Sequence, residues 1–221
     1  MTADAAIEAR SLYRFFRSGE EETLALQGVS MVVAGGELVV VVGPSGSGKS
    51  TLRACLAGLD EPDGGTVLVA GHRMSHQPEA ERARMPARRI GIMSQSANLF
   101  EHLPVRANLA FVHAVAPAAG ALSAGELLDQ VGLAERTDAY PGELSGGEAG
   151  RAGLAVALAG SPVVVLADEP TGELDSTTEA SVLAWLVGAA RHDIAVVVAS
   201  HSPAVAAADR IVRLDDGRVA A

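Results

Sequence analysis

The run Gly43-Pro44-Ser45-Gly46-Ser47-Gly48-Lys49-Ser50 combines flexible backbone, hydroxyls and an ammonium in the order that phosphate binding requires. Lys49 is the only lysine of the chain, whereas all sixteen other basic residues are arginines. A compact ammonium on a thin stem reaches between the β- and γ-phosphates of a nucleotide, where a planar guanidinium is too wide. The glycines let backbone N–H groups converge on the phosphates, and the Ser50 hydroxyl is available to Mg²⁺. The run therefore predicts a phosphate loop, with a nucleotide bound by Gly43, Pro44, Ser45, Gly46, Ser47, Gly48, Lys49, Ser50 and Thr51.

The residues on either side of this loop support the prediction. The apolar run 38–42 predicts a buried strand directly before it, and residues 51–59 predict a helix directly after it. The alternative is an accidental match in a chain that contains 24 glycines. Because strand, loop and helix follow one another as the motif requires, we expect nucleotide binding.

Two carboxylates, Asp168 and Glu169, directly follow the apolar run 163–167, which predicts a second buried strand. Asp168 at the strand tip is expected to hold Mg²⁺ through a water, complementing Ser50. Glu169 is expected to point to the other side and to polarise a water for in-line attack on the γ-phosphate. An ordinary acidic turn after a strand is the alternative. Together with the phosphate loop, the carboxylates predict nucleotide hydrolysis.

A third motif, Leu144-Ser145-Gly146-Gly147-Glu148, resembles the signature of the ATP-binding cassette (ABC) ATPases, and the resemblance covers nearly the whole chain. It implies that two copies bind ATP head to tail, with the signature serine and glycine amides on the γ-phosphate held by the other copy. Ser145 and Glu148 also match the capping-box pattern that opens a helix. Glu148 stands where glutamine is commoner in the family.

The resemblance assigns roles to further residues. Phe16 stands where the family places an aromatic side chain that stacks on adenine, with Tyr13 as the alternative if the register is different. Gln95 matches the glutamine that contacts Mg²⁺ and the attacking water, Asp175 the aspartate of the loop that crosses the dimer interface, and His201 the switch histidine at the γ-phosphate. The implied catalytic residues are Lys49, Gln95, Glu169 and His201; the implied Mg²⁺ contacts are Ser50, Gln95 and Asp168; the implied ATP contacts beyond the phosphate loop are Phe16, Ser145, Gly146, Gly147, Glu148 and Asp175.

The alternation of predicted strands and helices is typical of an α/β protein. Further strands are expected at 7–12, 29–33, 66–70, 90–93 and 195–199, and helices are expected to begin near Ser123, Ser145 and Ser176. Residues 104–158 show alanine-rich helical periodicity without a β-branched run. The expected fold is a P-loop NTPase core of the ABC type, with a mostly parallel sheet, an antiparallel β edge and an inserted helical lobe. We expect a single domain over 1–221, with a nucleotide-binding core over 1–95 and 160–221 and a helical lobe over 96–159.

Composition excludes several functions. The net charge of −10 over 221 residues, without a stripe of basic residues, argues against a nucleic-acid partner. The arginines at 82, 84, 88 and 89 are expected to form a solvated helix face. The single cysteine, Cys55, is predicted to be a small core residue in a reducing compartment. No stretch of about 18 uninterrupted apolar residues is present, so no segment is expected to span a bilayer.

The resemblance also implies an integral-membrane permease as a partner. Its expected docking site is the segment 96–105, through Leu99, Phe100 and Leu103; the alternative, that these three pack under the helical lobe, stays open. Glu148, the segment 58–65 and the short chain resemble the lipoprotein-release and macrolide-export branch of the family. The expected function is therefore the ATP-hydrolysing subunit of an export-type transporter. Its expected location is cytoplasmic, on the inner face of the cell membrane through the permease.

Two other functions stay open at this point. An ATPase subunit of a mechanotransmission complex that transports nothing would carry the same motifs. A soluble ABC ATPase acting on DNA or ribosomes is less favoured, since it should show a coiled-coil insertion, tandem cassettes or a basic face. A phosphate-loop kinase would leave the motif 144–148 unexplained.

Overall fold

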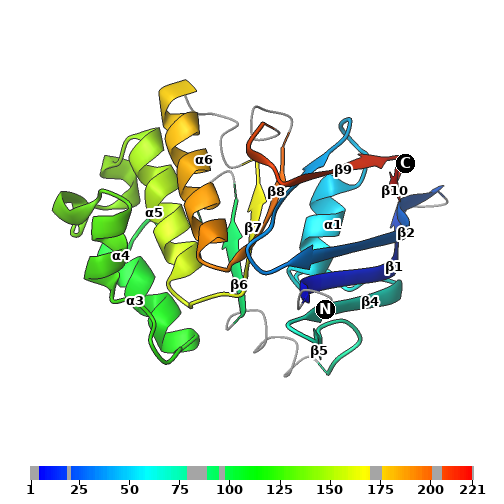
Figure 1. The fold of residues 1–221 in the computed structure, drawn as a ribbon, viewed down its shortest axis with the longest axis horizontal. Helices are drawn as coiled ribbons and strands as arrows, with labels where there is room; N and C mark the ends of the chain where they lie inside the picture. Colours follow the sequence, from blue (N-terminus) through cyan, green and yellow to red (C-terminus); the bar gives the residue numbers. More distant parts are fainter. Residues whose placement is uncertain are drawn as a thin grey trace.

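The computed structural model describes residues 5–18, 21–78, 89–94, 98–169, 176–200 and 206–220. These residues form an α/β fold with two sheets, one helix between them and a group of helices on the far side (Figure 1). The predicted fold class is confirmed.

The larger sheet is parallel except at one edge. Its strands are β3 (Leu38–Val42), β6 (Ile90–Met93), β7 (Val164–Asp168), β8 (Ala195–Ala199), β9 (Arg210–Asp215) and the antiparallel β10 (Arg218–Val219). They lie in the order β10-β9-β3-β8-β7-β6. Because all strands from β9 to β6 are parallel, their carboxyl ends meet at the same edge of the sheet.

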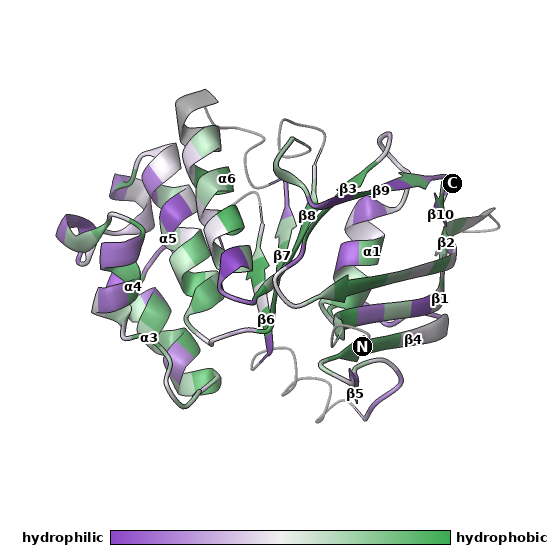
Figure 2. Ribbon diagram, in the orientation of Figure 1, coloured by the Kyte–Doolittle hydropathy of each residue, from purple (hydrophilic) through white to green (hydrophobic). Residues whose placement is uncertain are grey.

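Alternate residues of these strands enter two different hydrophobic cores. Val39 and Val197 pack with α1 (Lys49–Leu56) and the second sheet, whereas Val40 and Val198 pack with α6 (Ser176–Arg191). Both faces of the sheet are therefore covered, which explains why β3, β7 and β8 are nearly continuous apolar runs. These strands are largely green in Figure 2.

The smaller sheet is antiparallel and lies on the other side of α1. It contains β1 (Ala5–Ser18), β2 (Glu21–Ala34), β4 (Gly64–Val69) and β5 (His72–Arg73) in the order β2-β1-β4-β5. The first two strands are longer than the predicted 7–12 and 29–33. Their pairing shifts register at three points between Ala9 and Phe15, and such bulges break the two-residue alternation by which a strand is predicted.

The remaining helices have a core of their own. They are α3 (Val105–Val115), α4 (Ala124–Gln130) and α5 (Gly146–Leu158), with the short 3₁₀ turns η1 (Ala134–Arg136) and η2 (Pro141–Glu143). Val105, Leu109 and Leu128 are fully buried at their centre. The predicted capping boxes at Ser123 and Ser145 are both confirmed. Cys55, a residue of α1, is buried in the core as predicted, and burial raises the pKa of its thiol to about 12.

The helix α5 packs against the backbone of β6 through a glycine. A Cβ atom added at Gly91 would lie 2.3 Å from the carbonyl oxygen of Ala157. This contact holds the helix that begins at the signature motif against the edge strand of the parallel sheet. No room is left there for a methyl group.

Replacing Gly91 by alanine is therefore expected to lower the free energy of unfolding by about 1–3 kcal/mol, because the helix must move away from the strand. Gly188 in α6 is the matched control, since an added Cβ would meet no atom within 4 Å. Gly188→Ala is expected to stabilise the helix by about 1 kcal/mol at most. Urea unfolding of both variants measures the difference, and equal stabilities would contradict the close packing.

Candidate active site

The phosphate loop between β3 and α1 is enclosed by backbone from two distant parts of the chain. A Cβ atom at Gly43 would lie 2.0 Å from the carbonyl oxygen of Leu214 in β9. A Cβ atom at Gly48 would lie 2.4 Å from the carbonyl oxygen of Ala25 in β2, and Gly48 also has a φ of +99°. These two positions accept only glycine, because the obstacle is backbone in each case.

Hydrogen bonds join the same three segments. The Gly217 N–H donates to the Ser47 carbonyl at 3.0 Å, and the Gln27 N–H donates to the Gly217 carbonyl at 2.7 Å. Within the loop, the Ser47 N–H donates to the Pro44 carbonyl at 3.2 Å. The fold itself therefore constrains the shape of the loop.

The start of α1 has the features of an anion site. No side chain caps this helix, and its first turn holds no acidic residue, so its first N–H groups are available to a ligand. The hydroxyl of Ser47 is buried and makes no hydrogen bond. The ammonium of Lys49 donates to the carbonyls of Gly43 (2.8 Å) and Pro44 (3.0 Å). The first N–H groups of α1, the Ser47 hydroxyl and the Lys49 ammonium are therefore donors suited to the phosphates of a nucleotide.

Asp168 and Glu169 lie at the carboxyl end of β7, at the same sheet edge as the phosphate loop. Only β8 separates β7 from β3. The Arg53 Nε atom of α1 lies 3.1 Å from Asp168 Oδ2, with both side chains about four-fifths buried, although the pair lacks the alignment of a hydrogen bond. The Asp168 carboxylate is therefore held toward the helix that begins at Lys49. Sequence reasoning did not identify Arg53, because no motif marks it.

Glu169 has an unusual backbone conformation. Its φ is +44°, in the left-handed region that non-glycine residues adopt at a cost of roughly 1–2 kcal/mol. Its N–H donates to the Ala199 carbonyl at 2.9 Å, so the end of β8 fixes this conformation. Strain of this kind gathers at functional sites, where the fold holds a side chain in one orientation.

Three predicted site residues, Gln95, Asp175 and His201, lie outside the described residues. Two of them follow strands whose positions are known. Gln95 comes two residues after the end of β6, and His201 comes two residues after the end of β8. Both strands neighbour β7 in the sheet.

Near the end of β1, the two aromatic candidates have different surroundings. The Arg14 guanidinium lies 4.8 Å from the centre of the Phe16 ring, which is 42% exposed. Tyr13 instead lies close to Gly28 and lines a separate pocket with Gln27 and Arg218. Arg14 and Phe16 thus form a unit in which Tyr13 takes no part.

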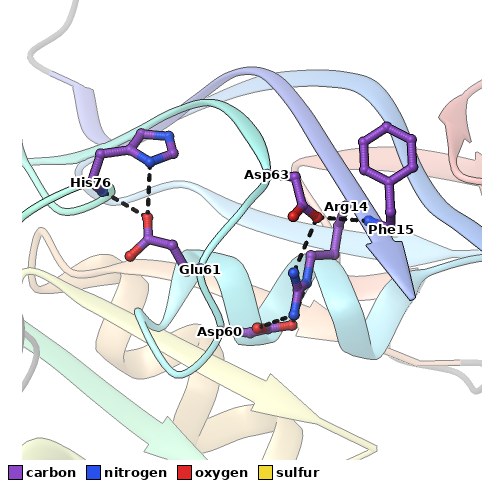
Figure 3. A network of polar contacts seen from close by, with 6 residues as sticks. All are labelled: Arg14, Phe15, Asp60, Glu61, Asp63 and His76. Atoms are coloured by element: carbon purple, nitrogen blue, oxygen red, sulfur yellow. Dashed lines mark hydrogen bonds and ion pairs between the residues drawn. The ribbon is translucent and has the colours of Figure 1, made fainter. Parts of the chain in front are cut away.

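Arg14 is itself fixed by carboxylates that follow α1 (Figure 3). It donates two hydrogen bonds to Asp60 (2.9 and 2.8 Å) and one to Asp63 (3.0 Å). Asp63 also accepts the Phe15 N–H at 2.8 Å. This hydrogen bond lowers the pKa of the Asp63 carboxyl, and the contact with Arg14 lowers it further. Burial opposes the charge of Arg14, but the hydrogen bonds hold its pKa above the ordinary value. A second pair, Glu61 and His76, ties the adjoining loop. The loop after α1 therefore sets the position of the Phe16 ring.

The signature motif lies at the exposed start of α5. Ser145 is the N-cap residue, and its hydroxyl accepts the Glu148 N–H at 3.2 Å, while Glu148 Oε2 accepts the Ser145 N–H at 2.8 Å. The helix α5 packs on the edge strand β6, and β6 lies three strand positions, about 14 Å, from β3. The helix that begins at the signature motif, α5, and the helix that follows the phosphate loop, α1, lie on opposite sides of the larger sheet (Figure 1).

The predicted docking segment has a mixed environment. Leu99 packs against the core of the helical group, in agreement with the alternative considered for it. Phe100 is 44% exposed, and its ring lies 5.1 Å from that of the exposed Phe111 in an edge-to-face arrangement. The buried Asn108 accepts the Phe100 N–H at 2.7 Å and donates to the Leu103 carbonyl at 3.0 Å. This amide fixes the loop that presents Phe100.

No group of three or more His, Cys, Asp and Glu side chains in the described ranges is arranged to hold a metal ion. Within the same ranges, no helix is both long enough and apolar enough to cross a membrane.

The chain has many relatives among known proteins. Residues 26–172 match the ABC transporter family. The chain is 38% identical to the lipoprotein-releasing system ATP-binding protein LolD of Chromohalobacter salexigens, over 96% of this chain and 92% of LolD. It is 40% identical to the methionine import ATP-binding protein MetN of Nocardia farcinica over 99% of this chain and 67% of MetN. It is 38% identical to the macrolide export ATP-binding/permease protein MacB of Shigella flexneri over 96% of this chain, but it spans only 34% of MacB.

A solved structure agrees with these matches. The dimeric ATP-binding cassette MJ0796, in a post-hydrolysis state bound to ADP and phosphate, has a TM-score of 0.87 and 31% identity, with 97% of each chain covered. The family match spans more than half of this chain, and LolD and the cassette align with nearly all of it. On this basis the chain belongs to the ABC transporter family and is an ATP-binding ATPase of that family.

Proposed function

We propose that this ATPase dimerises head to tail around two ATP molecules and drives a separate membrane permease, as an export-type member of the family. The observation that carries the proposal is that α5, which begins at the signature motif, and α1, which follows the phosphate loop, lie on opposite sides of the larger sheet (Figure 1). A second copy supplies the missing half of each site. We assign residues 1–95 and 160–221 to the nucleotide-binding core and 96–159 to the helical lobe.

The chemistry of the proposed ligands fits Mg²⁺. Ser50 would supply a hydroxyl, Asp168 a carboxylate and Gln95, which lies outside the described residues, an amide, and all three offer the oxygen atoms that Mg²⁺ prefers. Mg²⁺ commonly takes its other ligands from water and substrate phosphates, so a cluster of three carboxylates is not needed. When bound, it would neutralise charge on the β- and γ-phosphates.

The chemistry proposed for the site is in-line attack of water on the γ-phosphorus. Glu169 accepts a proton from the water as the new P–O bond forms, and the bond to the bridging oxygen breaks to release ADP. Lys49 leaves its two carbonyl partners and stabilises the charge on the phosphate oxygens. Gln95 orients the water, and His201 contacts the γ-phosphate.

Each site is completed by the partner copy in this proposal. The amides of Ser145, Gly146 and Gly147, at the N-terminus of α5, bind the γ-phosphate held by the other copy's loop. Asp175 lies at the interface between the copies. The dimer of the MJ0796 cassette, at 31% identity, supports this arrangement.

The permease is proposed from the relatives and from one surface. LolD and MacB are named for lipoprotein release and macrolide export, whereas MetN is named for import. Glu148 favours the first branch. The exposed pair Phe100 and Phe111 is the surface proposed for the permease, which would place the chain on the inner face of the cell membrane.

The adenine ring is proposed to stack on Phe16. Phe16→Ala is expected to weaken ATP binding about tenfold or more, since stacking on an aromatic side chain contributes roughly 1–3 kcal/mol per base. Phe16→Tyr should retain affinity. Tyr13→Ala is the matched control, because Tyr13 lies over Gly28 and not beside Arg14. Isothermal titration with ATP measures all three, and a larger loss for Tyr13→Ala would reverse the assignment.

The role of Glu169 is tested by Glu169→Gln, which preserves the shape of the side chain and removes the base. The rate at which the variant releases phosphate from ATP is expected to be at least about a hundredfold lower. It should still bind ATP and form a stable dimer in ATP and Mg²⁺, as measured by analytical ultracentrifugation.

The same variant tests the partner. Purified from membranes in mild detergent with ATP and Mg²⁺, it is expected to bring an integral-membrane protein with it. Loss of ATP binding would contradict the role of Glu169. Persistent monomers at saturating ATP would contradict the dimer.

A further inference from the structure

Glu148 places a negative charge beside the proposed γ-phosphate site. Its carboxylate lies in the first turn of α5, where the amides of the signature motif are expected to bind an anion. The pKa of Glu148 is lowered to about 2, mainly by the hydrogen bond from the Ser145 N–H and next by the hydrogen bond from Arg136. The side chain is therefore ionised at neutral pH. An uncompensated carboxylate at this place would repel a phosphate.

Arg136 supplies the opposite charge. Its Nε atom donates to Glu148 Oε1 at 2.8 Å, and Glu148 Oε2 remains occupied by the cap. The backbone of Arg136 belongs to η1, where its N–H donates to the carbonyl of the buried Leu133 at 2.9 Å. The fold thus presents this guanidinium to the signature motif from outside α5.

The cap itself does not require an arginine. The helix α4 begins with the same capping box, Ser123 and Glu126, and at the start of η2 the Glu143 carboxylate likewise accepts the Tyr140 N–H. In the part of the chain that the structure describes, Glu126 and Glu143 make these caps without an ion pair to a basic side chain. Of the three capping carboxylates, the one at the signature motif is the one that carries an arginine.

We propose that Arg136 is a positioning residue that cancels the charge of Glu148, so that the start of α5 accepts the γ-phosphate of the partner copy. This inference rests on the proposed head-to-tail dimer. It assigns the pair a role in dimerisation more than in folding, because half of the Arg136 side chain is exposed and such pairs contribute little to stability.

A double-mutant cycle in the full-length Glu169→Gln protein tests the proposal. The measured quantity is the ATP concentration that gives half-maximal dimer in Mg²⁺, by analytical ultracentrifugation. Arg136→Gln is expected to raise it by about fivefold or more, since it leaves the Glu148 charge unpaired. Adding Glu148→Gln to Arg136→Gln is expected to reverse most of that loss, because the glutamine is neutral and still able to accept the Ser145 N–H.

Two further variants separate charge from shape and position. Arg136→Lys keeps the charge and should retain most of the dimerisation. Arg106→Gln removes a comparable ion pair, Arg106 with Asp138 at 2.7 Å, on the same helical group away from the signature motif. It should behave like the parent. Urea unfolding and ATP binding to monomers should be closely similar across the set.

Three results would overturn the inference. Dimerisation of Arg136→Gln at the parent's ATP concentration would show that the charge has no effect. A double variant as poor as Arg136→Gln would show that Arg136 acts on its own and not through Glu148. If Arg136→Lys needs as much ATP for dimerisation as Arg136→Gln, the shape of the side chain matters and its charge does not. Failure of the Glu169→Gln parent itself to dimerise would instead refute the proposed function, and the inference with it.

Discussion

Contact of backbone with backbone around the phosphate loop is the constraint on which the rest of the structure depends. Gly43 lies against the carbonyl of Leu214 in β9, and Gly48 lies against the carbonyl of Ala25 in β2. These contacts draw a strand of each sheet to the same loop and direct the N-terminus of α1 toward the ligand. The fold itself therefore constrains the shape of the loop.

The charged groups of the site have partners within the chain. The Lys49 ammonium rests on two carbonyls of its own loop, Asp168 lies beside Arg53, and Glu148 is paired with Arg136. Such pairing avoids the cost of an isolated charge in a partly buried place. ATP must replace the first of these contacts, so binding exchanges internal interactions for interactions with the ligand.

Much of this arrangement could be predicted from sequence, because the signals are local. The apolar runs that became β3, β7 and β8, and the capping boxes at Ser123 and Ser145, depend on neighbouring residues alone. The full lengths of β1 and β2 could not be predicted, since bulges interrupt their alternation. The strand β9 was not predicted either, because charged residues flank its few buried positions.

The residues that sequence reasoning missed are all arginines. The carboxylates that pair with Arg14, Arg53 and Arg136 lie 46, 115 and 12 residues further along the chain, at Asp60, Asp168 and Glu148. Nothing local in the sequence distinguishes them from the other arginines of the chain. The segment around Phe100 was left open between two alternatives, and the structure divides it, with Leu99 packed inward and Phe100 exposed. Gln95, Asp175 and His201 remain predictions.

The central claim is that each ATP lies between the phosphate loop of one copy and the signature motif of another. The most direct measurement mixes two defective proteins in the Glu169→Gln background, one with Lys49→Ala and one with Ser145→Arg. Each alone should fail to retain ATP in a dimer. Their mixture should recover dimers that retain ATP at one of the two sites, because one intact loop faces one intact signature motif. No recovery on mixing, with both variants folded, would contradict a site shared between copies.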